Sequence, residues 1–136
     1  MSKGLVIYHG NCADGFTAAW LFRNYYGDAF DYIPAIYGEE PPNVEGRTVY
    51  LLDFSYKRGD VKRILKLARN VMVLDHHKSA IEDLRGLENE FGNFHRFTSL
   101  CESGAGLAWR YLHGSSVRPS LLVQYVQDRD LWKFEL

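Results

Sequence analysis

The sequence predicts an α/β fold of the Rossmann-like, three-layer kind, in which a mostly parallel sheet carries helices on both faces. Short apolar runs rich in β-branched residues alternate along the chain with segments of helical periodicity. This alternation is typical of parallel strands joined by helical crossovers. The length of 136 residues suits one domain, which we expect to span residues 1–136.

The first two predicted elements are a buried strand at residues 4–8 and a helix at residues 16–26. The apolar residues of the helix fall on two neighbouring stripes at helical spacing: Phe16, Ala18, Ala19, Trp20, Leu21, Phe22 and Tyr25. The breadth of this apolar surface predicts a largely buried helix. Gly27 suits the C-terminal end of that helix.

The run at residues 31–37 is the second predicted strand. Because Pro34 has no amide hydrogen, we expect this strand to lie at an edge of the sheet. The segment 38–46 contains two adjacent prolines and several acidic residues, a combination that predicts a surface loop. Three further apolar runs predict strands at residues 48–52, 71–74 and 94–97.

Four more segments have helical periodicity. They are residues 60–68, 81–91, 104–113 and 120–130. Ser103 is suited to cap the helix at 104–113, and Pro119 precedes the last helix. The segment from Ser103 to Gly106 either caps and packs that helix or presents its amides to a phosphate.

The composition excludes several classes of protein. Hydrophobic residues make up 46% of the chain and aromatic residues 15%, which is too rich for general disorder. The net charge of -1 does not favour a groove that holds nucleic acid by charge alone. No run is long enough to span a membrane, and residues 1–10 do not form a signal peptide. With only two cysteines, we expect a cytoplasmic protein.

Three of the apolar runs end in residues that bind metal ions. His9 follows the first run, Asp53 follows the run at 48–52, and Asp75-His76-His77 follows the run at 71–74. Because parallel strands bring their carboxyl ends to one edge of the sheet, we expect these side chains to meet. A mixed Asp and His cluster fits one or two Mn²⁺ ions, or Mg²⁺.

Four motifs occur together and in a fixed order: His9-Gly10-Asn11-Cys12-Ala13-Asp14-Gly15, Leu52-Asp53, Asp75-His76-His77 and Asp128-Arg129-Asp130-Leu131-Trp132. In these motifs the chain resembles the DHH phosphoesterase superfamily. The resemblance implies a Rossmann-like catalytic domain that holds one or two Mn²⁺ ions. It also implies hydrolysis of phosphodiester or phosphoanhydride bonds by an activated water.

The resemblance also implies a role for each motif residue. His77 would face the substrate phosphate, and Asp75 would orient the imidazoles. Asp53 would bridge two ions, and Asp130 is an alternative to Asp128 as the last ligand. The implied metal ligands are His9, Asp14, Asp53, His76 and Asp128.

The chain departs from the family pattern in two places. Many members carry a second aspartate in the first motif, where this sequence has Cys12. Either the thiol of Cys12 or the neighbouring amide oxygen of Asn11 replaces that ligand, or Cys12 packs against the end of the strand. Many members also continue into a smaller substrate-gripping domain, whereas only residues 133–136 follow the last motif here. We therefore expect the domain's own loops or a partner chain to select the substrate, or else an open site with weak selectivity.

The predicted function is hydrolysis of a nucleotide, a short oligonucleotide or a small phosphate compound. The alternative is a degenerate module that binds a metal ion or a nucleotide without turnover. The apolar residues 131–136 suggest a surface for a partner chain or a second copy of this chain.

Overall fold

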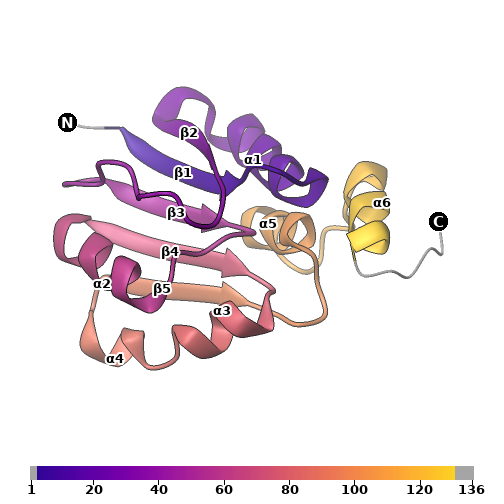
Figure 1. Cartoon of the computed structure of the whole chain (residues 1–136). Coiled ribbons are helices and arrows are strands. Elements are labelled where there is room, and N and C mark those ends of the chain that lie inside the picture. Colours follow the sequence, from indigo (N-terminus) through magenta and orange to yellow (C-terminus); the bar gives the residue numbers. More distant parts are fainter. Residues whose placement is uncertain (1–2, 131–136) are drawn as a thin grey trace.

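The computed structural model describes residues 3–130 and contains a five-stranded sheet (Figure 1). The strand order is β2-β1-β3-β4-β5, and every neighbouring pair is parallel. The strands are β1 (Gly4–His9), β2 (Phe30–Ala35), β3 (Thr48–Leu52), β4 (Asn70–Asp75) and β5 (Phe94–Thr98). All five predicted strands are therefore confirmed, with ends that differ by at most two residues.

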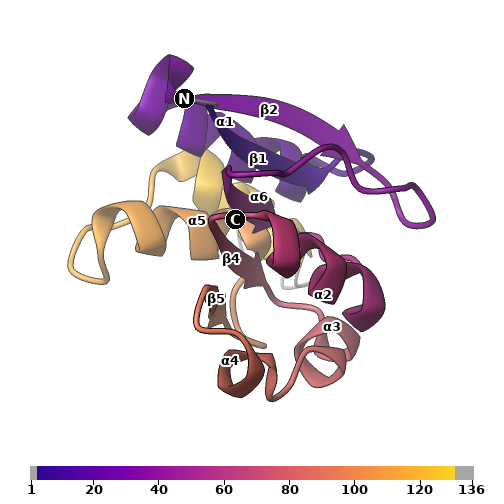
Figure 2. The same cartoon turned by 90° about the vertical axis from the view of Figure 1, so that its left-hand side faces the viewer.

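Helices cover both faces of the sheet (Figures 1 and 2). The helices α1, α5 and α6 lie on one face, and α2, α3 and α4 lie on the other. Their bounds are α1 (Ala13–Tyr26), α2 (Arg58–Leu67), α3 (Lys78–Asp83), α4 (Leu87–Glu90), α5 (Gly104–His113) and α6 (Leu121–Asp130), and a short 3₁₀ turn, η1 (Gly27–Ala29), follows α1. This arrangement is the predicted three-layer α/β fold.

Alternate residues of the central strands enter two separate cores. Leu5 and Ile7 of β1 pack in the core beneath α2, α3 and α4. Val6 belongs to the opposite core, beneath α1, α5 and α6, where Phe22 is fully buried. A strand that is buried on both faces has apolar residues at successive positions, which is why these strands appear in the sequence as continuous apolar runs.

The edge position predicted from Pro34 is confirmed. Strand β2 is the first strand of the sheet, and Pro34 lies opposite Tyr8 of β1. A proline removes one hydrogen-bond donor from its strand, and an edge strand needs donors on one side only.

Two predictions about the helices are wrong. The segment 81–91 is not one helix, because the chain turns between α3 and α4 at Gly86, which has a φ of 87°. Helix α1 starts at Ala13, and each of its two apolar stripes is buried only in part, because Tyr25 is exposed on the first and Phe16 and Trp20 are exposed on the second. Phe16 is 61% exposed and Trp20 is 44% exposed, so the helix is less buried than its composition predicts.

The strand order reverses direction between β1 and β3. From β1 the chain proceeds to β2 on one side of the sheet, and from β3 it proceeds to β4 on the other side. The crossover segments thus leave these two neighbouring strands in opposite directions, which opens a crevice at their carboxyl ends. His9 ends β1 and Asp53 follows β3, so both lie at this reversal point.

No helix within residues 3–130 is long and apolar enough to cross a membrane.

The close approach of α1 to β1 requires a glycine. A Cβ atom at Gly15 would overlap the backbone carbonyl oxygen of His9, whereas a Cβ atom at Gly59 in α2 would meet no atom within 4 Å. We expect Gly15→Ala to lower the free energy of unfolding by about 1 to 3 kcal/mol through overpacking. Gly59→Ala is the matched control, and it should leave stability unchanged or raise it by up to about 1 kcal/mol. Urea denaturation of both variants measures these effects, and equal stability of the two would contradict this packing.

Candidate metal centre

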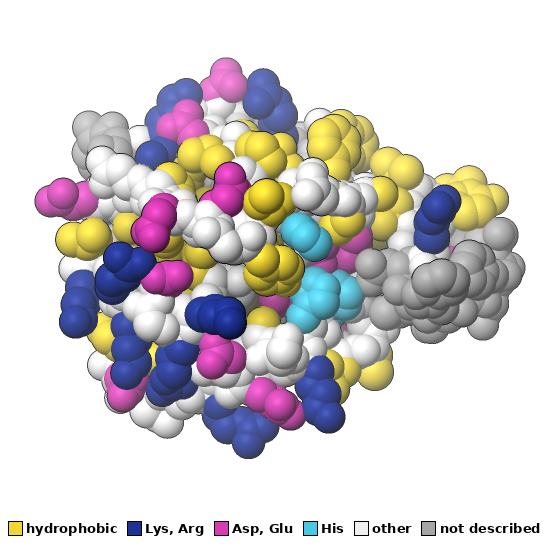
Figure 3. All heavy atoms as spheres, viewed as in Figure 1, with side chains coloured by type: hydrophobic (Ala, Val, Ile, Leu, Met, Phe, Trp, Pro, Cys, Tyr) yellow, Lys and Arg dark blue, Asp and Glu magenta, His cyan; other side chains and the backbone are white. Residues whose placement is uncertain are grey.

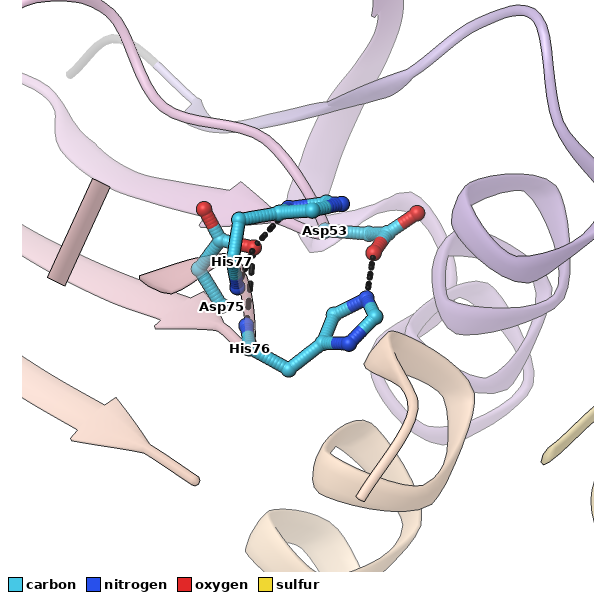
Figure 4. Close-up of side chains that lie close together, drawn as sticks. All are labelled: Asp53, Asp75, His76 and His77. Atoms are coloured by element: carbon cyan, nitrogen blue, oxygen red, sulfur yellow. Dashed lines mark hydrogen bonds and ion pairs between the residues drawn. The ribbon is translucent and has the colours of Figure 1, made fainter. Parts of the chain in front are cut away.

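The residues that follow β1, β3 and β4 come together at the carboxyl edge of the sheet. Figure 4 shows Asp53, Asp75, His76 and His77 converging there from two strand ends. In the space-filling view, histidine side chains reach the surface among hydrophobic and acidic side chains (Figure 3). Asp14, Asp53 and Asp75 are at most 3% exposed. Buried carboxylates of this kind need compensating charge or hydrogen bonds.

Asp53 occupies the middle of the cluster, and its two oxygens face different partners. Oδ1 lies 2.8 Å from Nε2 of His76. Oδ2 accepts a hydrogen bond from Sγ of Cys12 at 3.1 Å and lies 3.7 Å from Nδ1 of His9. The backbone of Asp53 has a φ of 56°. A non-glycine residue in this left-handed region costs of order 1 to 3 kcal/mol, and such residues cluster at functional sites.

Asp14 is held by the N-terminus of α5. The backbone amides of Gly104 and Ala105 donate to its two oxygens at 2.7 and 2.8 Å. Nε2 of His76 lies 3.3 Å from Oδ2 of the same carboxylate. The free amides and the dipole of a helix N-terminus stabilise a negative charge. Helix α5 thus keeps a buried aspartate ionised beside Asp53.

The predicted cap of α5 is confirmed. Oγ of Ser103 accepts a hydrogen bond from the amide of Gly106 at 3.0 Å. The amides of Gly104 and Ala105, which the sequence suggests as donors to a phosphate, instead donate to the carboxylate of Asp14. A Cβ atom at Gly104 would lie 2.6 Å from Cβ of Asp53, so a glycine is required at this contact. Sequence reasoning did not predict that the N-terminus of α5 binds Asp14. The cap residue Ser103, which marks that N-terminus, was the feature of the sequence that could have indicated it.

Burial and neighbouring charges shift the pKa values of Asp53, Asp14 and His76. Burial, together with the charge of Asp14, raises the pKa of Asp53 to about 6. Burial acts in the same direction on Asp14, but hydrogen bonds from His76 and from the α5 amides hold its pKa below the ordinary value. Burial alone would lower the pKa of His76, yet its contacts with Asp14 and Asp53 raise it to about 10. A protonated imidazole therefore supplies the positive charge between two carboxylates.

His77 has a different environment from His76. Its Nδ1 lies 2.6 Å from Oδ1 of Asp75, and this contact raises the pKa of His77. The side chain of His77 is 37% exposed, whereas that of His76 is 10% exposed. The ring centroids of the two histidines lie 4.3 Å apart. The two imidazoles therefore lie side by side but are held by different carboxylates.

Asp75 orients one imidazole rather than both. Its Oδ1 accepts from the backbone amides of His76 and His77 as well as from the His77 ring. The ring of His76 contacts Asp53 and Asp14 instead. Oδ2 of Asp75 is buried and has no hydrogen-bond donor within the described part of the chain. A buried acceptor of this kind is a fitting neighbour for a cation or a water molecule.

Cys12 points into the site. Its Sγ caps α1 by accepting a hydrogen bond from the backbone amide of Gly15. The same sulfur lies 3.3 Å from Nδ1 of His9. Burial, with smaller contributions from the charges of Asp53 and Asp14, raises the pKa of the thiol to about 12. Cys12 therefore has a structural role as the cap of α1, and its sulfur also lies within reach of His9 and Asp53.

Asp128 lies on α6 and is buried, at 8% exposure. Its neighbour Gln127 accepts a hydrogen bond from the amide of Ser103 at 3.2 Å. This part of α6 therefore meets the α5 turn that binds Asp14. The side chain of the alternative ligand Asp130 and the expected contact surface at residues 131–136 lie outside the described residues.

Within residues 3–130, two overlapping groups of side chains could hold a metal ion. Within each group, one ligand atom from each residue lies within 4.8 Å of the others. The groups are Asp53, Asp75, His76 and His77, and His9, Cys12 and Asp53. Asp53 belongs to both groups, so it joins the two halves of the site.

Comparison with known proteins gives one informative match. An uncharacterized protein of Acanthamoeba polyphaga mimivirus is 32% identical over 148 aligned residues, which include 97% of this chain. The chain spans about a third of the length of that relative, 34%. No protein-family model matches the sequence, and no solved structure matches it significantly.

The coupling of His76 to two carboxylates predicts a pH-dependent stability in the presence of a metal chelator. The pKa of His76 in the fold, about 10, is above its ordinary value of 6.5. The stabilisation is therefore complete below pH 6.5 and is lost as the pH rises toward 10. We expect the thermal unfolding midpoint in EDTA to fall over this range, and the fall to be smaller in His76→Gln. A wild-type midpoint that stays constant or rises would contradict the coupling.

Proposed function

We propose that this chain is a metal-dependent phosphoesterase of the DHH phosphoesterase superfamily, with Mn²⁺ as the natural ion and Mg²⁺ as a substitute. The observation that carries the proposal is the position of Asp53. One of its oxygens faces His76 and the other faces His9 and Cys12. A carboxylate that bridges two divalent ions presents its oxygens in this way, and paired ions are common in enzymes that cleave phosphate esters.

The donor set on the His76 side suits an ion that prefers oxygen. Asp14, Asp53 and Asp128 would supply carboxylates, and His76 would supply an imidazole. An octahedral ion with bonds of about 2.1 Å separates neighbouring ligand atoms by about 3.0 Å. Nε2 of His76 lies 2.8 Å from Asp53 and 3.3 Å from Asp14. The proton now shared by these groups would leave as the ion binds.

The ions would lower the pKa of the attacking water and neutralise the charge that develops on the phosphate oxygens. The α5 amides fix Asp14, and contacts with His76 and Cys12 hold the carboxylate of Asp53, so neither group would need to reorganise. Asp75 holds Nδ1 of His77 and raises its pKa. Nε2 is then the ring nitrogen of His77 that would donate to a phosphate oxygen.

A cavity beside the metal centre offers room for the rest of the substrate. It has a volume of about 370 Å³ and is lined by Tyr37, Ser55, Tyr56, Lys57, Ser79, Ala80 and Asp83. The ring of Tyr37 also meets the ring of His9 edge-on, with centroids 5.5 Å apart. This volume is within the range of small-molecule sites. It supports a substrate of the size of a nucleotide, a short oligonucleotide end or a small phosphate compound.

The alternative, a module that binds metal without turnover, is favoured by Cys12 at the place of a family aspartate. The two functions differ in one measurable property. Only the phosphoesterase hydrolyses bis(p-nitrophenyl) phosphate when Mn²⁺ is added to the metal-free chain.

Asp53→Asn tests the bridging carboxylate with little change in side-chain volume. Substituting a residue that only contacts a metal ligand typically lowers metal affinity by roughly 10- to 100-fold. We expect Asp53→Asn to lower Mn²⁺ affinity by more than this and to abolish hydrolysis. Asp60→Asn, on the surface of α2, is the matched control and should retain both properties. Calorimetric titration with Mn²⁺ and the hydrolysis assay measure them. Undiminished Mn²⁺ affinity in Asp53→Asn would remove the basis of the proposal.

The two adjacent histidines should give different signatures. His77→Ala should retain Mn²⁺ affinity and reduce kcat by about 10²- to 10³-fold, the usual effect of losing one charge-stabilising donor. His76→Ala should weaken Mn²⁺ binding, because it removes a ligand between Asp14 and Asp53. Equal loss of Mn²⁺ from both variants, or full activity of His77→Ala in an active enzyme, would show that the proposed roles are wrong.

A further inference from the structure

We infer that the His9 side of the centre binds a thiophilic divalent ion such as Zn²⁺, with the Cys12 thiolate as a direct ligand. The other two protein ligands are His9 and Asp53. The inference rests on the proposed two-metal centre and adds the chemical class of its second ion. It assigns the two sides of Asp53 to different metals, with the oxygen-preferring ion on the His76 side.

The spacing of the three ligand atoms suits one shared ion. Sγ of Cys12 lies 3.1 Å from Oδ2 of Asp53 and 3.3 Å from Nδ1 of His9, and these last two atoms lie 3.7 Å apart. A tetrahedral Zn²⁺ with bonds of about 2.0 to 2.3 Å separates its ligand atoms by about 3.3 to 3.6 Å. The three separations depart from these values by about 0.4 Å or less, so small side-chain movements would place the three atoms around one zinc ion.

The types of donor atom point to the same class of ion. A thiolate is a soft ligand that selects Zn²⁺ over Mg²⁺, Ca²⁺ and Mn²⁺. The imidazole of His9 is also a common ligand of Zn²⁺. Three protein ligands with one open position are the usual arrangement of a catalytic zinc site. The His76 side has no sulfur donor among the residues assigned to it, so the two sides differ in softness.

The fold directs the sulfur of Cys12 into this position. Cys12 is the N-cap of α1, and the amide of Gly15 donates to Sγ at 3.3 Å. Burial raises the pKa of this thiol to about 12, and the hydrogen bond from Gly15 acts in the opposite direction. Binding of the ion would release the thiol proton to solvent, with no change in oxidation state.

Cobalt provides the direct test, because Co²⁺ substitutes for Zn²⁺ and reports on sulfur ligation. We expect the Co²⁺-loaded chain of residues 1–136 to show a thiolate-to-cobalt charge-transfer band in the near ultraviolet. The exposed Cys101 supplies the matched control. Cys101→Ser should retain the band, and Cys12→Ser should lose it. A band that persists in Cys12→Ser, or bound Co²⁺ without the band in wild type, would overturn the inference.

Two further measurements make the test independent of the folding of one variant. X-ray absorption of the Zn²⁺-loaded wild-type chain should show one sulfur neighbour at about 2.3 Å, and a shell of only nitrogen and oxygen would refute thiolate ligation. Cys12→Asp should shift the preference of this side from Zn²⁺ toward Mn²⁺ in competitive titration, and an unchanged preference would count against the inference. All of these readouts need no substrate. Failure of phosphodiester hydrolysis with a normal sulfur signature would refute the proposed function alone.

Discussion

A buried carboxylate between two sets of donors is the constraint on which the rest of this structure depends. Asp53 is 1% exposed, and its two oxygens point to opposite sides of the site. An ionised group at this depth is costly unless positive charge or hydrogen bonds surround it. In the metal-free chain the charge comes from protonated His76, and hydrogen bonding comes from the thiol of Cys12. Divalent ions would supply the same compensation more completely.

The topology of the sheet explains why these donors meet. The strand order changes direction between β1 and β3, so the segments after these strands diverge and leave a crevice. The first α1 turn, which follows β1, contributes Cys12 and Asp14, and β3 ends at Asp53. Helix α5 enters from one face and fixes Asp14 with two amides. The site therefore combines strand ends and helix N-termini, and both are rigid parts of the fold.

Local pattern was sufficient to predict the sheet and the meeting of polar side chains at its carboxyl edge. The run at 48–52 matches β3 at both ends, because strands buried on both faces are continuously apolar. Pro34 identified the edge strand through its missing donor. Asp53 and His76 were predicted as site residues because polar side chains at the ends of parallel strands converge, and their contact at 2.8 Å agrees with that reasoning.

The remaining features depend on contacts between distant segments. The bond from Gly104 to Asp14 spans 90 residues, and no periodicity in the sequence encodes it. Phe16 was predicted to be buried because it is apolar and lies at helical spacing, yet its side chain is exposed. Helical spacing does not show how much of a helix its neighbours cover. Gly86 lies in a segment of helical periodicity, but its positive φ ends the helical path and separates α3 from α4. The sequence alone does not show whether a glycine in such a segment adopts a positive φ. The direction of the Cys12 side chain likewise follows from its role as a helix cap.

Anomalous diffraction from crystals grown with Mn²⁺ and Zn²⁺ tests the central claim most directly. Data collected at the absorption edge of each metal locate and identify every bound ion. The account predicts two ions on opposite sides of Asp53, one beside Oδ1 and His76 and the other beside Oδ2 and His9. A single ion, or ions bound away from the Asp53 carboxylate, would contradict it.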